Sequence, residues 1–140
     1  MAIFIGFIMI SSIAGFAMLS SRPIATKPVK TISHIVKGPL ESSEIVFIIR
    51  TGRVLIRDWY RENCTDCELV LQNLESFAEN FKDYVVLEKV EIPSNETEKL
   101  EIIGRGGEIR QLENITQENL MDVFCEIALL QPKECLLREV

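Results

Sequence analysis

The sequence predicts an α/β fold, because segments with the pattern of strands alternate with segments that have the pattern of helices. Residues 67–81 carry apolar side chains at steps of three and four, which is the pattern of a helix with one buried stripe. Residues 84–92 are rich in β-branched side chains and alternate in polarity, as strands do. With 140 residues, of which 47% are hydrophobic, the chain can bury the core of one domain.

Three elements are expected before that helix. Residues 31–36 are short and β-branched, which predicts an edge strand. Residues 44–50 follow a serine pair that can cap a short helix, although their run of β-formers leaves a strand as the competing prediction. Residues 53–60 are expected to form the central strand of the sheet.

Two further elements are expected after residue 92. Residues 100–103 and 108–112 flank a glycine-rich turn, which predicts a hairpin. No helix opens directly after this turn, so a phosphate-binding loop is disfavoured. A last helix, capped by Asn114 or Thr116, is expected to run to Leu130, and the proline that follows would end it.

The first twenty residues form the most apolar part of the chain. Residues 2–20 carry no charged side chain and would be roughly 28 Å long as a helix, about the thickness of a hydrocarbon core. We expect a transmembrane anchor over residues 1–20, a linker over residues 21–30 and a folded domain over residues 31–140. A cleaved signal peptide is the alternative, but a charged leading region and a clear cleavage site are missing.

Two sets of sequence features make opposite predictions about the side of the membrane on which the domain would lie. Positive charges follow the apolar segment and would, by the positive-inside rule, keep the domain in the cytoplasm. Four cysteines in a short chain suit an oxidising compartment, as do Asn-x-Thr sequons at Asn63, Asn95 and Asn114. We therefore expect a single-pass membrane protein whose soluble domain lies outside the cytoplasm.

The charge of the chain limits its partners. The formal net charge is −6, and no basic patch with interleaved aromatic residues is present, so we expect no nucleic-acid partner. Three carboxylates near the predicted hairpin, Glu96, Glu98 and Glu101, are expected to form a solvated acidic rim.

Cys64 and Cys67 are three residues apart, between the predicted central strand and the amphipathic helix. Such a pair is a recognised dithiol redox arrangement. The positive end of the helix would lie beside the first sulfur and favour its thiolate, which is the reactive form. The second sulfur, one turn into the helix, could attack a mixed disulfide formed at the first. The pair therefore indicates thiol–disulfide chemistry.

Two more cysteines, Cys125 and Cys135, lie ten residues apart at the end of the chain. Four cysteines allow three pairings, and pairing within each neighbouring couple needs the fewest long-range coincidences. Cys125 as a small buried apolar residue is one alternative, and a zinc site made of all four sulfurs is another. Zinc sites usually use two closely spaced pairs, so we expect no metal. The single histidine, His34, is expected to be solvated or part of the core.

With these residues in place, the chain resembles a thioredoxin. The family's central strand ends in an aspartate, two aromatic residues and often a glutamate before Cys-x-x-Cys, and the matching positions here are Asp58, Trp59, Tyr60, Glu62, Cys64 and Cys67. Lys89 falls where thioredoxins carry a lysine close to the buried aspartate. The resemblance covers roughly residues 31–130. It implies a shortened thioredoxin-like fold, with a central mixed β-sheet flanked by helices, after the N-terminal transmembrane helix.

The resemblance also implies roles for single residues. Cys64 would be the attacking thiolate and Cys67 the resolving thiol. Asp58, buried under the site, would accept the proton of Cys67, and Lys89 would tune its pKa. Burial would raise the pKa of that carboxyl, as proton exchange near neutral pH requires.

The chain departs from the thioredoxin pattern in three places. Only seven residues, 93–99, separate the strand ending at residue 92 from the next one, so the family's intervening helix is expected to be missing. Lys99 aligns with the family's cis-proline, which lies beside the dithiol and binds substrate backbone. Thr65-Asp66 replaces the usual Gly-Pro between the cysteines, and an added carboxylate there would disfavour the Cys64 thiolate.

The expected function is thiol–disulfide exchange through Cys64 and Cys67 in a membrane-anchored domain, without a cofactor. Its partners would be protein thiols and disulfides. A membrane electron-transfer partner would supply or take reducing equivalents, and the anchor would raise the effective concentration of the two partners. The alternative is a non-catalytic thioredoxin-like subunit or adaptor of a membrane complex, which the missing cis-proline favours.

Overall fold

A computed structural model of the chain describes residues 31–62, 64–113 and 115–138. The anchor and linker that we predicted for residues 1–20 and 21–30 lie outside these ranges, as do two of the sequon asparagines, Asn63 and Asn114.

The predicted membrane localisation is corrected by this structure. Within the described ranges, no helix is long and apolar enough to cross a bilayer. The longest, α3 at Thr65–Asn80, would be roughly 24 Å long and carries polar side chains along its exposed side. The prediction of a single-pass membrane protein with its domain outside the cytoplasm is therefore wrong on this finding and is not carried forward.

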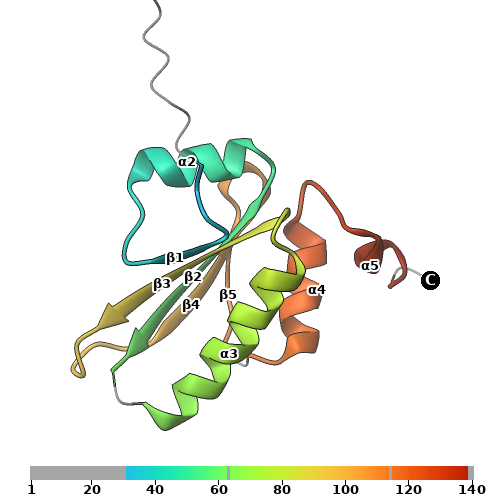
Figure 1. Ribbon diagram of the computed structural model, residues 1–140. Coiled ribbons are helices and arrows are strands. Elements are labelled where there is room, and N and C mark those ends of the chain that lie inside the picture. The colour runs from blue at the N-terminus through green and yellow to red at the C-terminus, as the bar shows by residue number, and fades with distance from the viewer. Residues whose placement is uncertain (1–30, 63, 114, 139–140) are drawn as a thin grey trace, which may run out of the picture. The chain divides into compact units, whose positions relative to one another are not determined.

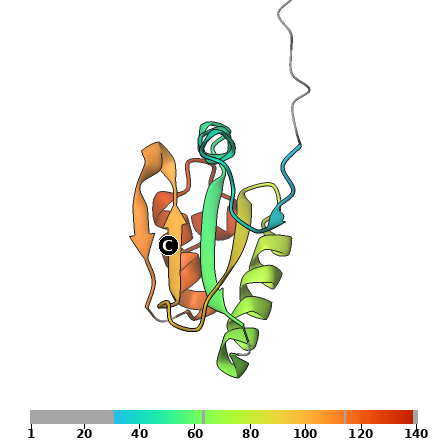
Figure 2. The same ribbon diagram turned by 90° about the vertical axis from the view of Figure 1, so that its left-hand side faces the viewer.

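The fold is built around a mixed five-stranded sheet in the order β1-β3-β2-β4-β5 (Figure 2). The strands are β1 Ile35–Lys37, β2 Val54–Arg61, β3 Val85–Ile92, β4 Lys99–Ile103 and β5 Ile109–Gln111. β1 and β2 both run parallel to β3, whereas β4 and β5 join by antiparallel pairing. Parallel strands need crossover connections: the helix α2 (Ser42–Arg50) connects β1 to β2, and α3 connects β2 to β3.

The two faces of the sheet pack against different helices. On one face, α3 and α4 (Gln117–Ile127) lie over the central strands (Figure 1). Three rings from these helices and the turn after α3 form the centre of that core, with centroids 4.8–5.5 Å apart: Phe77, Phe81 and Phe124. On the other face, Ile48 of α2 packs with Leu55, Val86 and Ile103. The first halves of the inner strands β2 and β3 are therefore apolar on both faces.

The segment 44–50, for which the sequence left helix and strand open, is a helix. Ile45, Ile48 and Ile49 are spaced so that one side of α2 packs on the sheet. The helix begins at Ser42, and its N-cap is Glu41, whose backbone N–H donates to Glu44 Oε2 at 3.0 Å. Both serines that were expected to cap the helix, Ser42 and Ser43, therefore lie within its first turn.

The connection between β3 and β4 is short, as predicted. Residues 93–98 pass directly from the end of one strand to the start of the other, with no helix between them. β4 then pairs with β2 so that Lys99 lies opposite Trp59 and Leu100 opposite Asp58. This connection brings Glu98 to the end of the sheet where the dithiol lies.

The C-terminal part differs from the prediction at its end. α4 stops at Ile127 rather than near Leu130, and a short helix that was not predicted, α5 at Lys133–Leu136, begins after Pro132. Before it, the predicted hairpin is present as β4 and β5, joined by a 3-10 turn at Arg105–Gly107.

Candidate dithiol redox site

Cys64 and Cys67 are joined as a disulfide at the N-terminus of α3. Cys64 is the N-cap residue, and its Sγ accepts a hydrogen bond from the backbone N–H of Cys67 at 3.2 Å. Both side chains are partly exposed. A backbone N–H of the first helical turn thus points toward the first sulfur, where it would stabilise a thiolate after reduction.

Asp58 lies below the dithiol, on the face of β2 that α3 covers. It is 5% exposed, and its Oδ2 atom is buried without a hydrogen-bond partner among the described residues. Burial is the main reason why the pKa of Asp58 is raised to about 6, and the negative charge of Glu98 adds to the rise. The positive charge of Lys89 acts in the opposite direction.

Lys89 is directly across the strand pair from Asp58, in the register of β2 and β3. It is buried, and its ammonium group binds the carboxylate of Glu75 on α3. The direct partner of Lys89 is thus a helix carboxylate, and Lys89 influences Asp58 through charge alone.

Two residues that the sequence analysis did not assign to the site contact the dithiol region. Glu98 Oε1 lies 3.0 Å from Cys67 Sγ and 2.8 Å from Nε of Arg61, at the end of β2. Glu98 adjoins Lys99, which the sequence analysis placed at the position of the family's cis-proline. That neighbourhood was the one sequence signal that could have placed Glu98 here.

These residues line one groove. It has a volume of about 530 Å³, and its lining combines the two cysteines and the carboxylates of Asp58 and Glu98 with apolar Val70 and Ile115. The groove is open to solvent at the disulfide, so a peptide or small disulfide could approach the sulfur atoms from outside.

Among the described residues, the one group of atoms that could hold a metal ion is at the dithiol. The sulfur atoms of Cys64 and Cys67 and a carboxylate oxygen of Glu98 lie within 4.8 Å of one another. In the disulfide state neither sulfur is a thiolate, which is the form that binds metals. We assign no metal to this site.

The remaining cysteines form a second disulfide, Cys125–Cys135, which joins α4 to α5. Cys135 is buried at 2% exposure, and no free cysteine remains among the described residues. Each cysteine is thus bonded to the cysteine nearest to it in the sequence. The alternative of a zinc site with four sulfur ligands would require both disulfides to be reduced.

The histidine and the acidic rim of the sequence analysis have different environments in the structure. His34 pairs with Glu79 of α3 at 2.8 Å. Of the three carboxylates expected to form a solvated rim, Glu96 and Glu98 are exposed, but Glu101 is 8% exposed and pairs with Lys99. The prediction for Glu101 was wrong because that residue lies within β4, beside the central strand.

The chain matches no protein-family model and no curated protein sequence. Solved structures of similar fold include several thioredoxins. A mutant thioredoxin from Halobacterium salinarum has a TM-score of 0.53 and 16% identity, with 73% of this chain and 99% of the other covered. Chloroplastic thioredoxin z has a TM-score of 0.52 and 19% identity, with 66% and 93% covered.

A fragment of ERdj5, J-Trx1, is also similar, with a TM-score of 0.50 and 16% identity. The match covers 66% of this chain but only 49% of that fragment, so the chain spans about half of its length. At these identities the likeness concerns the fold. The chain therefore has a thioredoxin-like α/β fold, with a mixed five-stranded sheet and a Cys-x-x-Cys pair, Cys64 and Cys67, at the start of α3.

Proposed function

We propose that this chain is a thiol–disulfide oxidoreductase that acts through Cys64 and Cys67. The observation that carries the proposal is the position of the pair, a partly exposed disulfide at the N-terminus of α3 beside an open groove. In the reduced state Cys64 attacks a substrate disulfide, and Cys67 then attacks Cys64 in the resulting mixed disulfide. The substrate leaves as two thiols, and the 64–67 disulfide forms.

Asp58 supports this chemistry as an internal proton carrier. A carboxyl whose pKa is about 6 can accept and return a proton near neutral pH, whereas an ordinary aspartate is almost fully ionised there. Lys89, paired with Glu75, contributes a fixed positive charge on the same side of the sheet and so limits how far the pKa of Asp58 rises.

The substrates in this proposal are proteins that carry thiols or disulfides, and the catalytic domain is residues 31–140. The two sulfurs themselves carry the electrons, so the exchange needs no cofactor. Cys125 and Cys135 hold the last helix and have no part in the exchange.

A second candidate function is that of a non-catalytic thioredoxin-like subunit. The observation that favours it is Lys99, which stands where thioredoxins have a substrate-binding proline and whose side chain is paired with Glu101. In that case the 64–67 disulfide would be structural.

The reduction potential of the 64–67 pair separates the two candidates. The full chain is equilibrated in glutathione buffers, and free thiols are counted after alkylation. An oxidoreductase gives a reversible potential between about −120 and −270 mV, as known dithiol enzymes do. A pair that does not cycle, or that stays oxidised far below this range, makes the disulfide structural.

Single cysteine substitutions test the roles. Cys64→Ser should abolish exchange while the protein still unfolds cooperatively, and Cys67→Ser should accumulate a mixed disulfide between Cys64 and a protein substrate. Reduction of protein disulfides by Cys64→Ser at the unsubstituted rate would end the proposal.

A further inference from the structure

Glu98 has a position that the proposed roles of Cys64, Cys67 and Asp58 do not explain. Its Oε1 atom is 3.0 Å from Cys67 Sγ, although the two residues are separated by 31 positions in the chain. The short connection 93–98 leads straight into β4, and the pairing of Leu100 with Asp58 places the residue before Lys99 beside the start of α3. The short connection, which contains no helix, therefore carries Glu98 directly to the dithiol.

Arg61 holds the Glu98 carboxylate in this place. Its Nε atom donates to the same Oε1 atom at 2.8 Å, and the two side chains are 43% and 36% exposed. A charge-assisted hydrogen bond of this kind orients the carboxylate and is stronger than a bond between neutral groups. Arg61 and Cys67 both contact Oε1 of Glu98, so the oxygen that faces Cys67 is the one that Arg61 holds in place.

The buried aspartate has a different relation to the sulfurs. Asp58 lines the same groove, but among the described residues its Oδ2 has no hydrogen-bond partner, and no hydrogen bond to either sulfur is present. Glu98 is the carboxylate in contact with a reacting atom, and it is also open to solvent. A proton that it accepts can therefore leave directly to water.

We infer that Glu98 is a catalytic acid–base residue that takes the proton of the Cys67 thiol during resolution and returns it in the reverse reaction. The inference rests on the proposed oxidoreductase function. In the mixed disulfide, the Cys67 proton moves to Glu98 Oε1, and the resulting thiolate attacks Cys64 Sγ. The bond between Cys64 and the substrate sulfur breaks as the 64–67 bond forms. The substrate leaves as a thiolate and takes a proton from water, so that the substrate is reduced and the dithiol oxidised.

The groups that surround Glu98 determine how this step responds to pH. Charged and titratable side chains surround Glu98 on several elements. β2, β3 and β4 contribute Asp58, Tyr60, Arg61, Lys89 and Lys99, α3 contributes Cys67 and Glu75, and the segment after β5 contributes Glu113. Arg61 is the cation in direct contact with Glu98, and Asp58 is the acid coupled to it by charge. The step should therefore depend on both carboxyl groups rather than on one.

A single-turnover experiment on the full chain separates the two sulfur steps. Reduced protein in excess is mixed with dithiobis(nitrobenzoate), which releases one coloured thiolate when Cys64 attacks and a second when Cys67 resolves the mixed disulfide. The Cys64→Ser/Cys67→Ser variant supplies the background from the other cysteine pair. The first phase reports the proposed function, and the second reports the inference.

Glu98→Gln should slow the second phase at neutral pH by on the order of 100-fold, within the range for loss of a general base, and leave the first phase within about twofold. The deficit should shrink as pH rises, because Cys67 then loses its proton to water without help. Glu98→Asp should retain part of the rate. The matched control is Glu96→Gln, an exposed glutamate of the same loop, which should leave both phases unchanged.

Equal second phases in the unsubstituted chain and Glu98→Gln across the pH range would overturn the inference, as would a second phase lost only in Asp58→Asn. Absence of the first phase in the unsubstituted chain would instead defeat the proposed function. An exposed side chain is replaced, so oxidised Glu98→Gln should still unfold cooperatively on heating, with only the small loss of stability that removal of an exposed ion pair causes, which checks that the fold is intact.

Discussion

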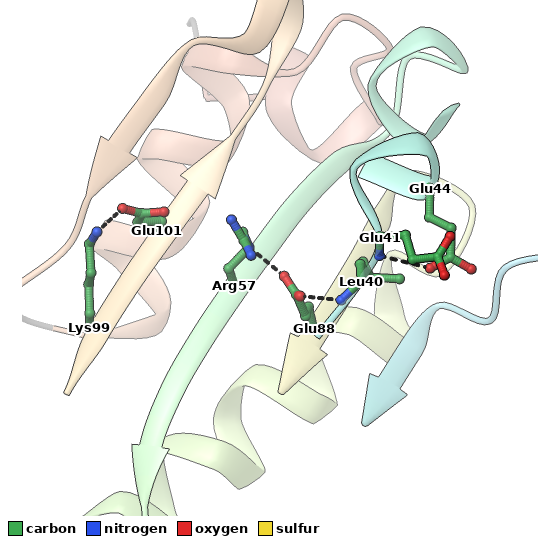
Figure 3. Close-up of polar contacts among 7 residues, drawn as sticks. All are labelled: Leu40, Glu41, Glu44, Arg57, Glu88, Lys99 and Glu101. Atoms are coloured by element: carbon green, nitrogen blue, oxygen red, sulfur yellow. Dashed lines mark hydrogen bonds and ion pairs between the residues drawn. The ribbon is translucent and has the colours of Figure 1, made fainter. Parts of the chain in front are cut away.

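The carboxylate of Glu88 on β3 is paired with the guanidinium of Arg57, its direct neighbour on β2, although Glu88 is 0% exposed (Figure 3). The Glu88 Oε2 to Arg57 Nε distance is 2.5 Å, and Glu88 Oε1 accepts the backbone N–H of Leu40 at 2.7 Å. The Arg57 guanidinium also lies 4.6 Å from the centre of the Trp59 ring. Both oxygens of the buried Glu88 carboxylate thus have a hydrogen-bond partner, which offsets the cost of burying the charge.

Removal of the arginine should destabilise the protein strongly. Arg57→Met leaves the Glu88 carboxylate buried without a cation, and we expect the free energy of unfolding to fall by about 3 kcal/mol. The double variant Arg57→Met/Glu88→Gln should recover much of this loss, because a neutral amide costs less to bury than a carboxylate. Urea unfolding at neutral pH measures both.

An exposed ion pair provides the control for that experiment. Arg110 and Glu126 are 2.9 Å apart, with side chains 45% and 60% exposed. Arg110→Met should change the free energy of unfolding by less than about 1 kcal/mol. Equal losses in Arg57→Met and Arg110→Met would contradict the view that burial makes the Glu88 pair important.

The raised pKa of Asp58 predicts that its removal stabilises the protein above neutral pH. Burial favours the protonated form of the carboxyl. Between pH 3.8 and about 6 the folded state therefore keeps a proton that the unfolded state has already released. Stability from this group is complete at low pH and is lost as pH rises through about 6. Asp58→Asn should raise the free energy of unfolding of the oxidised protein by about 2–3 kcal/mol near pH 8.

The pH profile distinguishes this effect from a general improvement in packing. The advantage of Asp58→Asn should shrink toward zero near pH 4, where the unsubstituted carboxyl is protonated in the folded state. Denaturant unfolding of both proteins between these pH values gives the comparison. A constant advantage at every pH would show that the gain has another origin.

The Cys125–Cys135 bond should stabilise the fold without taking part in exchange. It closes a loop of ten residues, for which the chain-entropy relation gives about 2–3 kcal/mol. The double variant Cys125→Ala/Cys135→Ala should lose that much stability and keep the reduction potential of the 64–67 pair. A changed potential would instead show that the two disulfides are coupled.

Gly104 permits close contact between the end of β4 and the end of α4. A Cβ atom there would lie 2.6 Å from the backbone oxygen and from two side-chain atoms of Ile127. Gly104→Ala should therefore lower the free energy of unfolding by about 3 kcal/mol, since the backbone itself has to move. Thermal unfolding measures the loss.

Gly106, in the following turn, is the matched glycine. Its Cβ would have open space, but its φ of +69° is unfavourable for other residues, so Gly106→Ala should cost only about 1 kcal/mol. A larger loss for Gly106→Ala than for Gly104→Ala would contradict the packing argument.

Much of the fold was predictable because the signals are local. The stripe along residues 67–81 and the alternation in residues 84–92 each predicted an element that is present as α3 and β3. The segment 44–50 was ambiguous because its β-formers favour a strand locally, and its packing against Leu55 and Val86 decides for a helix. The end of α4 and the short α5 depend on contacts that local patterns do not contain.

The candidate site was predictable in part for the same reason. The dithiol and Asp58 belong to one stretch of ten residues, so a local pattern could reveal them. The approach of Glu98 to Cys67 requires the antiparallel pairing of β4 with β2, which is a long-range contact. Likewise, Glu101 has the composition of a surface residue and is buried only because of its place in β4.

The central strands present a problem of alignment that their apolar residues alone do not solve. Val54-Leu55-Ile56 lies beside Val85-Val86-Leu87, so a shift of one residue would still bring apolar side chains together on both faces. The same shift would turn Glu88 away from Arg57 and toward the opposite face, leaving a carboxylate among hydrocarbon side chains. The charged pair therefore distinguishes the native register from its neighbours, and the position of Lys89 opposite Asp58 depends on that distinction.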